Sequence, residues 1–560
     1  MNAPHRPPYI FNKDTLKLRV ELDRGVVEVD ARATSLDLTN RDLSDENLKL
    51  VLGLFDYMPL REHLKKLLLG HNKITYVGAC SIAESIHAGF PQLDTFDISY
   101  NSIGDKGLEV IASTLRRQNP SPCPVLREFN VSCNGITVAG ALHINKLIRR
   151  TDGTLNVLFE NNPINGDGLG YIISAKFWES FSINNTNADD GFQQFVRSYS
   201  GKAFNLKHLT IIRFSLPSSS LRDNHLSQAN FPYLSSLLTC IPVPTLQTLK
   251  IEEPLGAEGM NVLVSVAKHR SVASLKQLTL YHCAQTPSLV FTLVQEITRG
   301  GYPMLKELAV AEDAFELTMH FVTTITDHKC LDMLMKTPST RWTDEIATSF
   351  FLPASTASFE WQNTGALPLA CIFNASLLAL SLLDLRSVQI TTCYETVDSL
   401  LRFFASLPPS LQTLKIDGLT LSSPDTAPDA ATDTKIDPAA DPKIDPKIDP
   451  KPLHALHPYM IQLSFSHVTE PSLLVRALAE VVSNELALNL EDVPLTDADI
   501  GTLFEGMRKK GVVVRELQVK KDGLSPESIQ MVSLMSPPVV TPPPEDNEPQ
   551  GTRCKLCTIC

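Results

Sequence analysis

The chain has 560 residues, and a single hydrophobic core stops growing at about 250–300 residues, so the chain must form several domains or a repeat array. Its formal net charge of -12 argues against nucleic acid as the main partner, because phosphate binding needs Lys and Arg clustered on one face. No apolar run approaches the roughly 20 residues that span a bilayer, and the N-terminal residues lack the apolar core of a secretory signal, so we expect a soluble, cytoplasmic protein.

The first 33 residues match no repeat. Residues 15–30 alternate between apolar and polar side chains, which predicts a hairpin that turns at Asp23-Arg24-Gly25. The end of a repeat array exposes apolar surface that such a hairpin covers. We therefore expect residues 1–33 to form an N-terminal cap.

One sequence motif repeats through residues 34–175. It has the form apolar-x-apolar-x-x-Asn-x-apolar and reads LLLGHNKI, FDISYNSI, FNVSCNGI and VLFENNPI, after a weaker first copy, LDLTNRDL. The spacing is about 29 residues, with small insertions. A buried Asn satisfies backbone N–H and C=O groups where the chain leaves a strand, and such groups are costly when unpaired. We therefore expect a structural ladder made of Asn72, Asn101, Asn134 and Asn162.

A pattern with helical period follows each phrase. Gly78, Ile82 and Ile86 lie four residues apart, and the same spacing begins again at Gly107 and Gly140. Residues at this spacing share one face of a helix, so each unit is predicted to be a strand, a turn and a helix. One unit cannot bury its own apolar face, so neighbouring units must stack.

These units resemble leucine-rich repeats of the ribonuclease-inhibitor type, in which a strand is paired with a full α-helix. The resemblance implies an α/β fold, a solenoid with a curved parallel sheet inside and helices outside. It also implies that exposed side chains on the concave strands bind another protein. The candidate binding residues on these strands are Asp37, Asp97, Ser99, Asn130, Glu160, Lys250, Glu252 and Tyr281.

Between residues 176 and 432 the repeats continue in a degenerate form. The strand phrase persists, but the Asn position is taken by Phe214, Pro254, Cys283 and Asp313. The rhythm breaks at 176–205, 216–235 and 336–370, which look like loops or irregular repeats. Clearer repeats return at 453–535. Parallel strands are predicted near residues 36, 67, 96, 129, 157, 249, 278, 308, 488 and 517.

Residues 433–452 repeat Lys-Ile-Asp-Pro between two predicted strands. Proline at every fourth position blocks both helix and sheet pairing, so this low-complexity segment is predicted to be an extended surface loop.

Residues 536–560 form a Pro-rich tail that we expect to be disordered, and they end in Cys554, Cys557 and Cys560. Metal binding is disfavoured because structural sites usually take four ligands, and disulfides are disfavoured in the cytosol; an unmodified tail stays open. The last four residues resemble a C-a-a-X prenylation signal, although Cys560 lies outside the usual terminal residues. The resemblance implies a lipid on Cys557 and, because one chain anchors only marginally, a second on Cys554. We therefore expect tethering to the cytoplasmic face of a membrane.

Motifs for catalysis are not found. The sequence contains no Walker phosphate loop, zinc-protease His pair or Gly-x-Ser-x-Gly elbow, and Gly166-Asp-Gly-Leu-Gly170 lacks the third glycine spacing of a dinucleotide loop. We expect no cofactor, no metal and no enzymatic activity, and interpret the chain as a protein-interaction scaffold. The alternative is a regulator of a small GTPase, because GTPase-activating proteins of the Ran type are built from the same class of repeat.

Overall fold

The computed structural model describes residues 9–535, apart from scattered single residues or pairs and the segments 118–120, 201–206, 213–227, 241–245, 324–327, 338–351, 369–384, 423–460 and 481–484. The chain divides into two compact units, residues 1–362 (unit 1) and residues 363–560 (unit 2). The Lys-Ile-Asp-Pro segment at 433–452 and the tail at 536–560 lie outside the described residues.

Unit 1 begins with a three-stranded antiparallel sheet. It consists of β1 (Ile10–Asn12), β2 (Lys17–Leu22) and β3 (Gly25–Asp30), with β2 paired to both neighbours. The alternating residues of β2 and β3 bury their apolar side chains, as at Val20 and Val29. Asn47 Nδ2 donates to Asp23 Oδ2 at 3.1 Å, which ties the hairpin turn to the first repeat.

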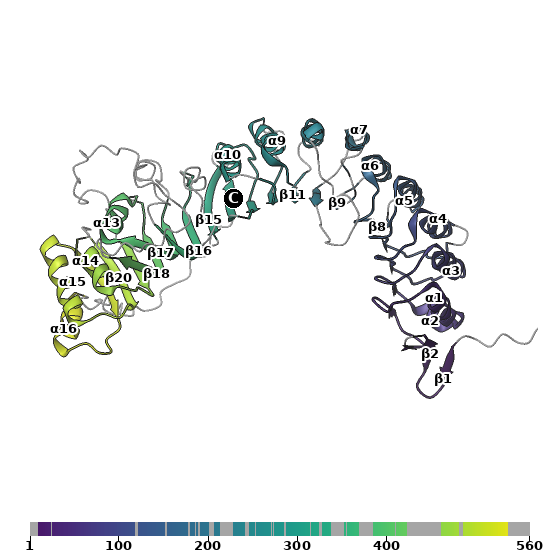
Figure 1. Cartoon of the computed structure of the whole chain (residues 1–560), viewed down its shortest axis with the longest axis horizontal. Helices are drawn as coiled ribbons and strands as arrows, with labels where there is room; N and C mark the ends of the chain where they lie inside the picture. The colour runs from purple at the N-terminus through teal and green to yellow at the C-terminus, as the bar shows by residue number, and fades with distance from the viewer. Residues whose placement is uncertain are drawn as a thin grey trace, which may run out of the picture. The chain divides into compact units, whose positions relative to one another are not determined.

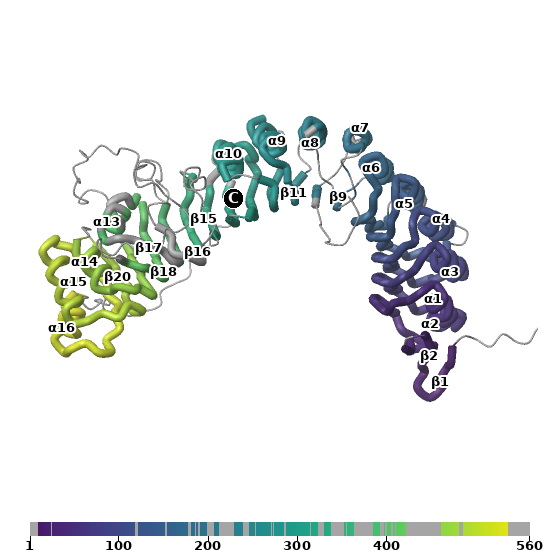
Figure 2. Tube along the Cα trace, viewed as in Figure 1, coloured from purple at the N-terminus to yellow at the C-terminus, as the bar shows by residue number. Residues whose placement is uncertain are grey.

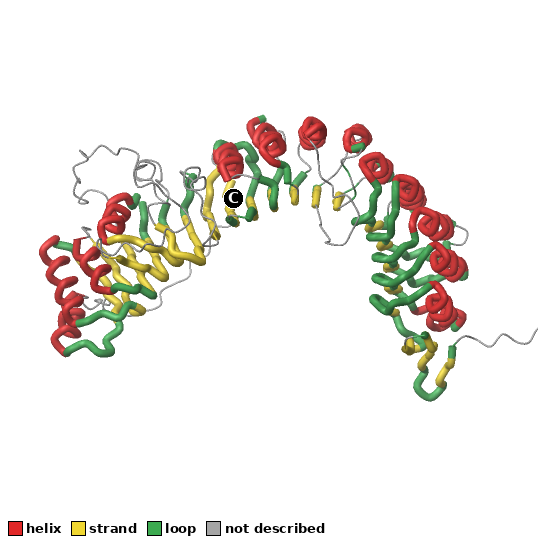
Figure 3. Tube along the Cα trace, viewed as in Figure 1, coloured by secondary structure: helices red, strands yellow, loops and turns green. Residues whose placement is uncertain are grey.

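Five strand-and-helix units follow this sheet. Their strands pair in parallel, and their helices cover one side of the strands (Figures 1 and 3). The middle residue of each strand is buried against the helices, and Phe96 and Phe129 stack there with their ring centroids 5.2 Å apart. In chain order the elements are β4 (Ser35–Asp37), α1 (Asp45–Leu52), the 3-10 helix η1 (Gly53–Asp56), α2 (Met58–His63), β5 (Lys66–Leu68), α3 (Tyr76–His87), β6 (Thr95–Asp97), α4 (Gly104–Leu115), β7 (Glu128–Asn130), α5 (Val138–Arg150), β8 (Asn156–Leu158) and α6 (Asn165–Ile173).

A second sheet of unit 1 starts at β9. Strands β9 to β13 pair in parallel, whereas β13, β14 and β15 pair antiparallel, a departure from the all-parallel arrangement expected. The stretch 176–205, where the sequence rhythm breaks, contains a strand and a helix. The elements are β9 (Ser180–Asn184), α7 (Phe192–Ser200), β10 (His208–Ile212), η2 (Gln228–Asn230), α8 (Phe231–Cys240), β11 (Thr248–Glu252), α9 (Gly256–Lys268), β12 (Gln277–Tyr281), α10 (Pro287–Thr298), β13 (Glu307–Ala311), β14 (Glu316–Thr323) and β15 (His328–Thr337); β16 (Ser358–Pro368) crosses the unit boundary.

Unit 2 is built from the same kind of strand-and-helix unit. Its strands β17 to β21 pair in parallel in sequence order. A capping box between Thr496 and Asp499 starts α15, and Gly511 ends it in the left-handed conformation. The elements are β17 (Ser387–Thr396), α13 (Val397–Ser406), β18 (Thr413–Ser422), β19 (Ile461–Ser466), α14 (Pro471–Glu480), β20 (Glu485–Asp492), α15 (Asp497–Lys510), β21 (Val513–Val519) and α16 (Pro526–Met535). The predicted α/β solenoid is confirmed.

The four repeated asparagines form a ladder of hydrogen bonds inside unit 1. Asn162 is fully buried; its Nδ2 donates to Val131 O, Phe159 O and Glu160 O at 2.9–3.2 Å. Its Oδ1 accepts from Asn134 N and Ile136 N of the preceding repeat at 2.8 and 3.0 Å. Each Asn side chain therefore joins its own turn to that of the repeat before it. Asn72, Asn101 and Asn134 make the equivalent bonds.

Two other residue types continue the ladder where Asn is missing. The Cys283 thiol donates to Ile251 O and Tyr281 O, both at 3.3 Å, as an Asn amide would. The acceptor for Cys283 N and Ala284 N is Glu312 Oε1, at 3.0 and 2.9 Å. From the sequence, Asp313 is expected at the Asn position of this repeat. In the structure Asp313 lies at the surface beside His282. Glu312 is one residue earlier, and its longer side chain reaches the backbone groups.

A second link joins the helices and has no counterpart in the sequence predictions. Asp105 of α4 accepts from Thr137 N, Thr137 Oγ1 and Gly140 N at the start of α5, at 2.6–2.9 Å. Asp45 makes the same three bonds to the start of α3. The carboxylate sits at the positive end of a helix dipole and satisfies N–H groups that have no partner within the helix.

Stability should fall with rising pH because of Glu312. Burial raises the pKa of Glu312 to about 7 from the ordinary 4.5, against the two backbone N–H bonds that lower it. Between pH 4.5 and pH 7 the folded chain therefore binds more protons than the unfolded chain. The contribution of Glu312 to the free energy of unfolding is fully present below pH 4.5 and is lost as the pH rises through 7. Because the carboxyl is partly exposed, solvent screens its charge. We therefore expect the free energy of unfolding to fall by about 1–2 kcal/mol, less than the full pKa shift would give.

Glu312→Gln keeps an acceptor oxygen and removes the ionisation. Urea unfolding at acid and mildly alkaline pH should show the wild type losing stability relative to Glu312→Gln as pH rises. Glu316→Gln, at an exposed position, should track the wild type. Parallel pH profiles for wild type and Glu312→Gln would contradict this assignment.

Candidate functional site on the concave face of unit 1

The solvent-facing side chains of the unit 1 strands lie on the side of the strands opposite the helices, which we call the concave face. The strands run along the inner side of unit 1, opposite the helices (Figure 2). Six of the predicted binding residues lie on strands of this face: Asp37, Asp97, Asn130, Lys250, Glu252 and Tyr281. Ser99 and Glu160 lie two positions after the ends of β6 and β8.

Several of these side chains bind their own backbone. Asp97 Oδ1 accepts from Ser99 N at 2.7 Å, and its Oδ2 accepts from Asn130 Nδ2 at 3.0 Å. Asn130 Oδ1 accepts from Ser132 N at 3.1 Å. Asp37 accepts from the backbone of Thr39, and that bond lowers the pKa of the Asp37 carboxyl. These bonds fix the strand ends, and the bond from Thr39 favours the charged form of the Asp37 carboxyl.

Six of the eight predicted residues fall into two groups, which leave out Asp37 and Glu160. Asp97, Ser99 and Asn130 are joined by the bonds above, but Ser99 is only 5% exposed and offers little surface to a partner. Lys250, Glu252 and Tyr281 form a separate group on β11 and β12: Lys250 Nζ lies 3.7 Å from Glu252 Oε2 and 5.2 Å from the Tyr281 ring centroid.

A crevice opens on the concave face where one sheet ends and the next begins. β8 and β9 belong to different sheets, and the crevice between them has a volume of about 180 Å³. The buried rings of Phe159, Trp178 and Phe181 line it. Glu160 and His208 contribute polar groups to its lining, together with Ser182 and Thr210. Pockets for small ligands and cofactors measure about 300–1,000 Å³, so this crevice has the size for one inserted side chain.

The crevice was not predicted from the sequence. Residues 176–205 break the repeat rhythm, so the strand that carries Ser182 was not recognised. The available signal was Trp178-Glu-Ser-Phe181, a pair of large aromatic residues directly ahead of an alternating stretch.

The first half of the concave face is acidic. Strands β4 to β8 and the residue two positions after β8 carry one cation, Lys66, and four carboxylates, which are Asp37, Asp97, Glu128 and Glu160. This surface is therefore complementary to a positively charged partner.

The described part of the chain offers neither a metal-binding cluster nor a membrane-spanning helix. There, no group of three or more His, Cys, Asp or Glu side chains is placed to hold a metal ion. No described helix is long and apolar enough to cross a membrane.

Comparison with known proteins agrees with this geometry. The family model described as "Leucine Rich repeat" matches residues 62–83, 93–112 and 123–144, which are three successive strand-and-helix units. The chain contains leucine-rich repeats. Its α/β leucine-rich repeat solenoid carries the concave face on the strand side, as such repeats do. A search of curated protein sequences finds no match.

Solved structures with similarity to the chain were also found. An internalin (inlF) from Listeria monocytogenes is 12% identical, with a TM-score of 0.28, over 71% of this chain and 85% of the internalin. The TLR13–ssRNA13 complex is 12% identical, with a TM-score of 0.29, over 84% of this chain and 61% of that one.

Proposed function

We propose that the chain is a non-catalytic protein-interaction scaffold that binds a partner protein on the concave face of unit 1. Proteins with leucine-rich repeats are generally scaffolds of this kind. The observation that carries the proposal is the crevice at the β8–β9 junction, with its aromatic lining and the polar groups of Glu160 and His208.

The chemistry of the face indicates the kind of partner. A volume of about 180 Å³ accommodates one apolar or aromatic side chain, which the rings of Phe159 and Trp178 would contact. The carboxylates along β4 to β8 favour lysine or arginine beside that anchor. We therefore assign the concave face to a basic polypeptide segment with one large apolar residue.

Site-specific photo-crosslinking tests this proposal. A photoreactive amino acid at position 208, within the crevice, should capture a partner protein in cells, whereas the same group at Lys106, an exposed position in the first turn of α4, should not. Purified partner should then bind the Glu160→Lys variant more weakly than the wild type. Equal capture at both positions, or unchanged affinity for Glu160→Lys, would contradict concave binding.

The type of repeat is a proposal as well. Each of the first five units pairs a short strand with an α-helix, which supports the ribonuclease-inhibitor-like class. The alternative of small-GTPase regulation shares this class of repeat. A GTP hydrolysis assay with a panel of small GTPases distinguishes them, since a scaffold leaves every hydrolysis rate unchanged.

Lipidation of Cys557 stays a sequence-based prediction, because Cys554 and Cys557 lie outside the described residues. It applies to a chain that ends at Cys560, and it would place the scaffold at the cytoplasmic face of a membrane. Mass spectrometry of the C-terminal peptide from cells should show a prenyl group on Cys557 that Cys557→Ser lacks. Membrane fractions should contain less of Cys557→Ser and of Cys554→Ser than of the wild type. A wild-type peptide with an unmodified Cys557 would refute the prediction.

A further inference from the structure

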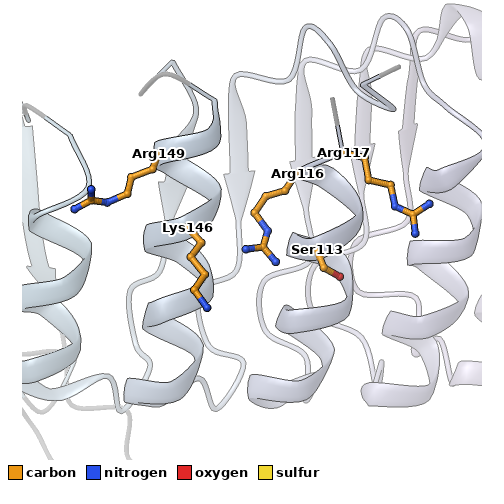
Figure 4. Close-up of a pocket in the computed structure, with 5 residues that line it drawn as sticks. All are labelled: Ser113, Arg116, Arg117, Lys146 and Arg149. Atoms are coloured by element: carbon orange, nitrogen blue, oxygen red, sulfur yellow. The ribbon is translucent and has the colours of Figure 1, made fainter. Parts of the chain in front are cut away.

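The helix side of unit 1 carries a cluster of positive charge, in a chain whose formal net charge is -12. Arg116, Arg117, Lys146 and Arg149 line a shallow depression of about 580 Å³ together with Ser113 (Figure 4). They lie near the ends of α4 and α5, two helices of adjacent repeats. We call these four cations the basic strip.

The strip extends across four helices. Arg116 reaches from α4 toward α5, whereas Arg117 and Arg149 point in opposite directions (Figure 4). Arg117 contacts the ring of His87 at the end of α3, with its guanidinium 2.7 Å from Nδ1. Arg149 donates to Ser174 O, directly after α6, at 2.9 Å. The charges therefore form a row that follows the repeats.

The basic strip differs from neighbouring cations in its ion pairing. Elsewhere in the same block, Lys73 pairs with Asp42 and Arg127 with Asp94. Among the described residues, no carboxylate pairs with any cation of the basic strip. Burial lowers the pKa of the nearby His143; the charge of Glu109 raises it, the charges of Lys146 and Arg116 lower it, and Asp105 raises it slightly.

The helix dipoles account for only part of the positive charge. A helix C-terminus carries about half a negative elementary charge, so α4 and α5 together offset roughly one of the four cations. Arg116 Nε, for example, donates to Ala112 O in the last turn of α4. Most of the positive charge is therefore available to a ligand.

We propose that the basic strip binds an acidic polypeptide segment of a partner protein. Packed helices lie about 8–10 Å apart, and a polyproline II chain advances about 3.1 Å per residue with three residues per turn, so carboxylates at every third residue would lie on one side of the chain and match the row. Nucleic acid carries a charge about every 1.7 Å and would be repelled by the remaining acidic surface of the chain. A membrane surface favours apolar side chains beside the cations, and this depression is lined by cations and Ser113 instead.

Fluorescence anisotropy with a designed peptide tests the proposal on the full chain. The probe is a labelled peptide of about 18 residues with glutamate at every third position, and its glutamine counterpart is the negative control. The wild type should bind the glutamate peptide, and added salt should weaken the binding. Arg116→Gln with Lys146→Gln should lower the affinity about 3- to 30-fold, the range expected for two exposed charge contacts.

A matched charge change guards against a general electrostatic effect. Lys49→Gln with Lys106→Gln removes the same charge from exposed positions in α1 and at the opposite end of α4, and should leave the affinity within about twofold. Arg117→Gln with Arg149→Gln provides an independent second pair that should also weaken binding. Thermal unfolding of each variant verifies the fold.

Three outcomes would overturn the proposal. The first is that the wild type fails to bind the glutamate peptide. The second is that both pairs of strip variants bind as the Lys49/Lys106 control does. The third is that single-stranded DNA or phosphatidylserine vesicles bind more tightly than the peptide and depend on the same arginines. These outcomes do not affect the concave-face proposal, because none of the substituted residues lies on the strands.

Discussion

Gly166→Ala is expected to destabilise unit 1 by about 3 kcal/mol or more, a large effect for one methyl group. A Cβ atom at position 166 would lie 2.2 Å from Gly191 C, 2.3 Å from Gly191 O and 2.4 Å from Phe192 N. These are backbone atoms at the start of α7, so no side-chain rotation relieves the overlap. The backbones of α6 and α7 must separate, and the packing of both helices is lost.

Gly501→Ala is the control for this substitution. Gly501 lies inside α15, and a Cβ atom there would meet nothing within 4 Å. Alanine is the better helix former, so this variant should be unchanged or more stable by up to about 1 kcal/mol. Urea unfolding monitored by circular dichroism measures both variants. An unchanged unfolding midpoint for Gly166→Ala would show that α6 and α7 do not pack as described.

Asn162→Ala should lower the free energy of unfolding by about 2–4 kcal/mol. The substitution removes the acceptor of Asn134 N and Ile136 N and the donor to three carbonyl groups, at a position that is fully buried. Water cannot easily replace the lost bonds there, so the backbone groups stay partly unpaired.

Two further variants show whether the loss of stability comes from the ladder hydrogen bonds or from losing any amide side chain. Asn156→Ala, on the exposed side of β8, should change stability by less than about 0.5 kcal/mol. Asn162→Cys should lose less than Asn162→Ala, because the Cys283 thiol makes the equivalent donor bonds in its own repeat. If all three variants unfold at the same urea concentration, the ladder contributes nothing.

The fold could be predicted because each repeat is encoded locally. Leu67, Phe96 and Phe129 mark the strands, the Asn five residues later marks the turn, and apolar residues four apart mark the helix. The predicted strands near residues 36, 67, 96, 129 and 157 are β4 to β8. Stacking follows from the need of each unit to cover the apolar face of the next.

The remaining features depend on residues brought together across repeats. Glu312 took the place expected for Asp313 because side-chain reach, rather than alignment position, decides which carboxylate meets Cys283 N. Glu160 and His208 line the same crevice, and β9 lies between them in the chain. The sequence pattern does not predict β9. The basic strip combines Arg116 with Lys146, 30 positions later, and one sequence does not show that these positions share a surface.

The change of sheet between β8 and β9 has a consequence for cooperativity. Neighbouring strands of one sheet exchange several backbone bonds, but here the backbone links Asn161 N to Asn184 O and Asn165 N to Thr186 O start from residues past the end of β8. Coupling at this junction therefore depends heavily on the contact of α6 with α7. Native-state hydrogen exchange is expected to reveal two foldons in unit 1 that open separately, with the amides of β4 to β8 in one and those of β9 to β13 in the other.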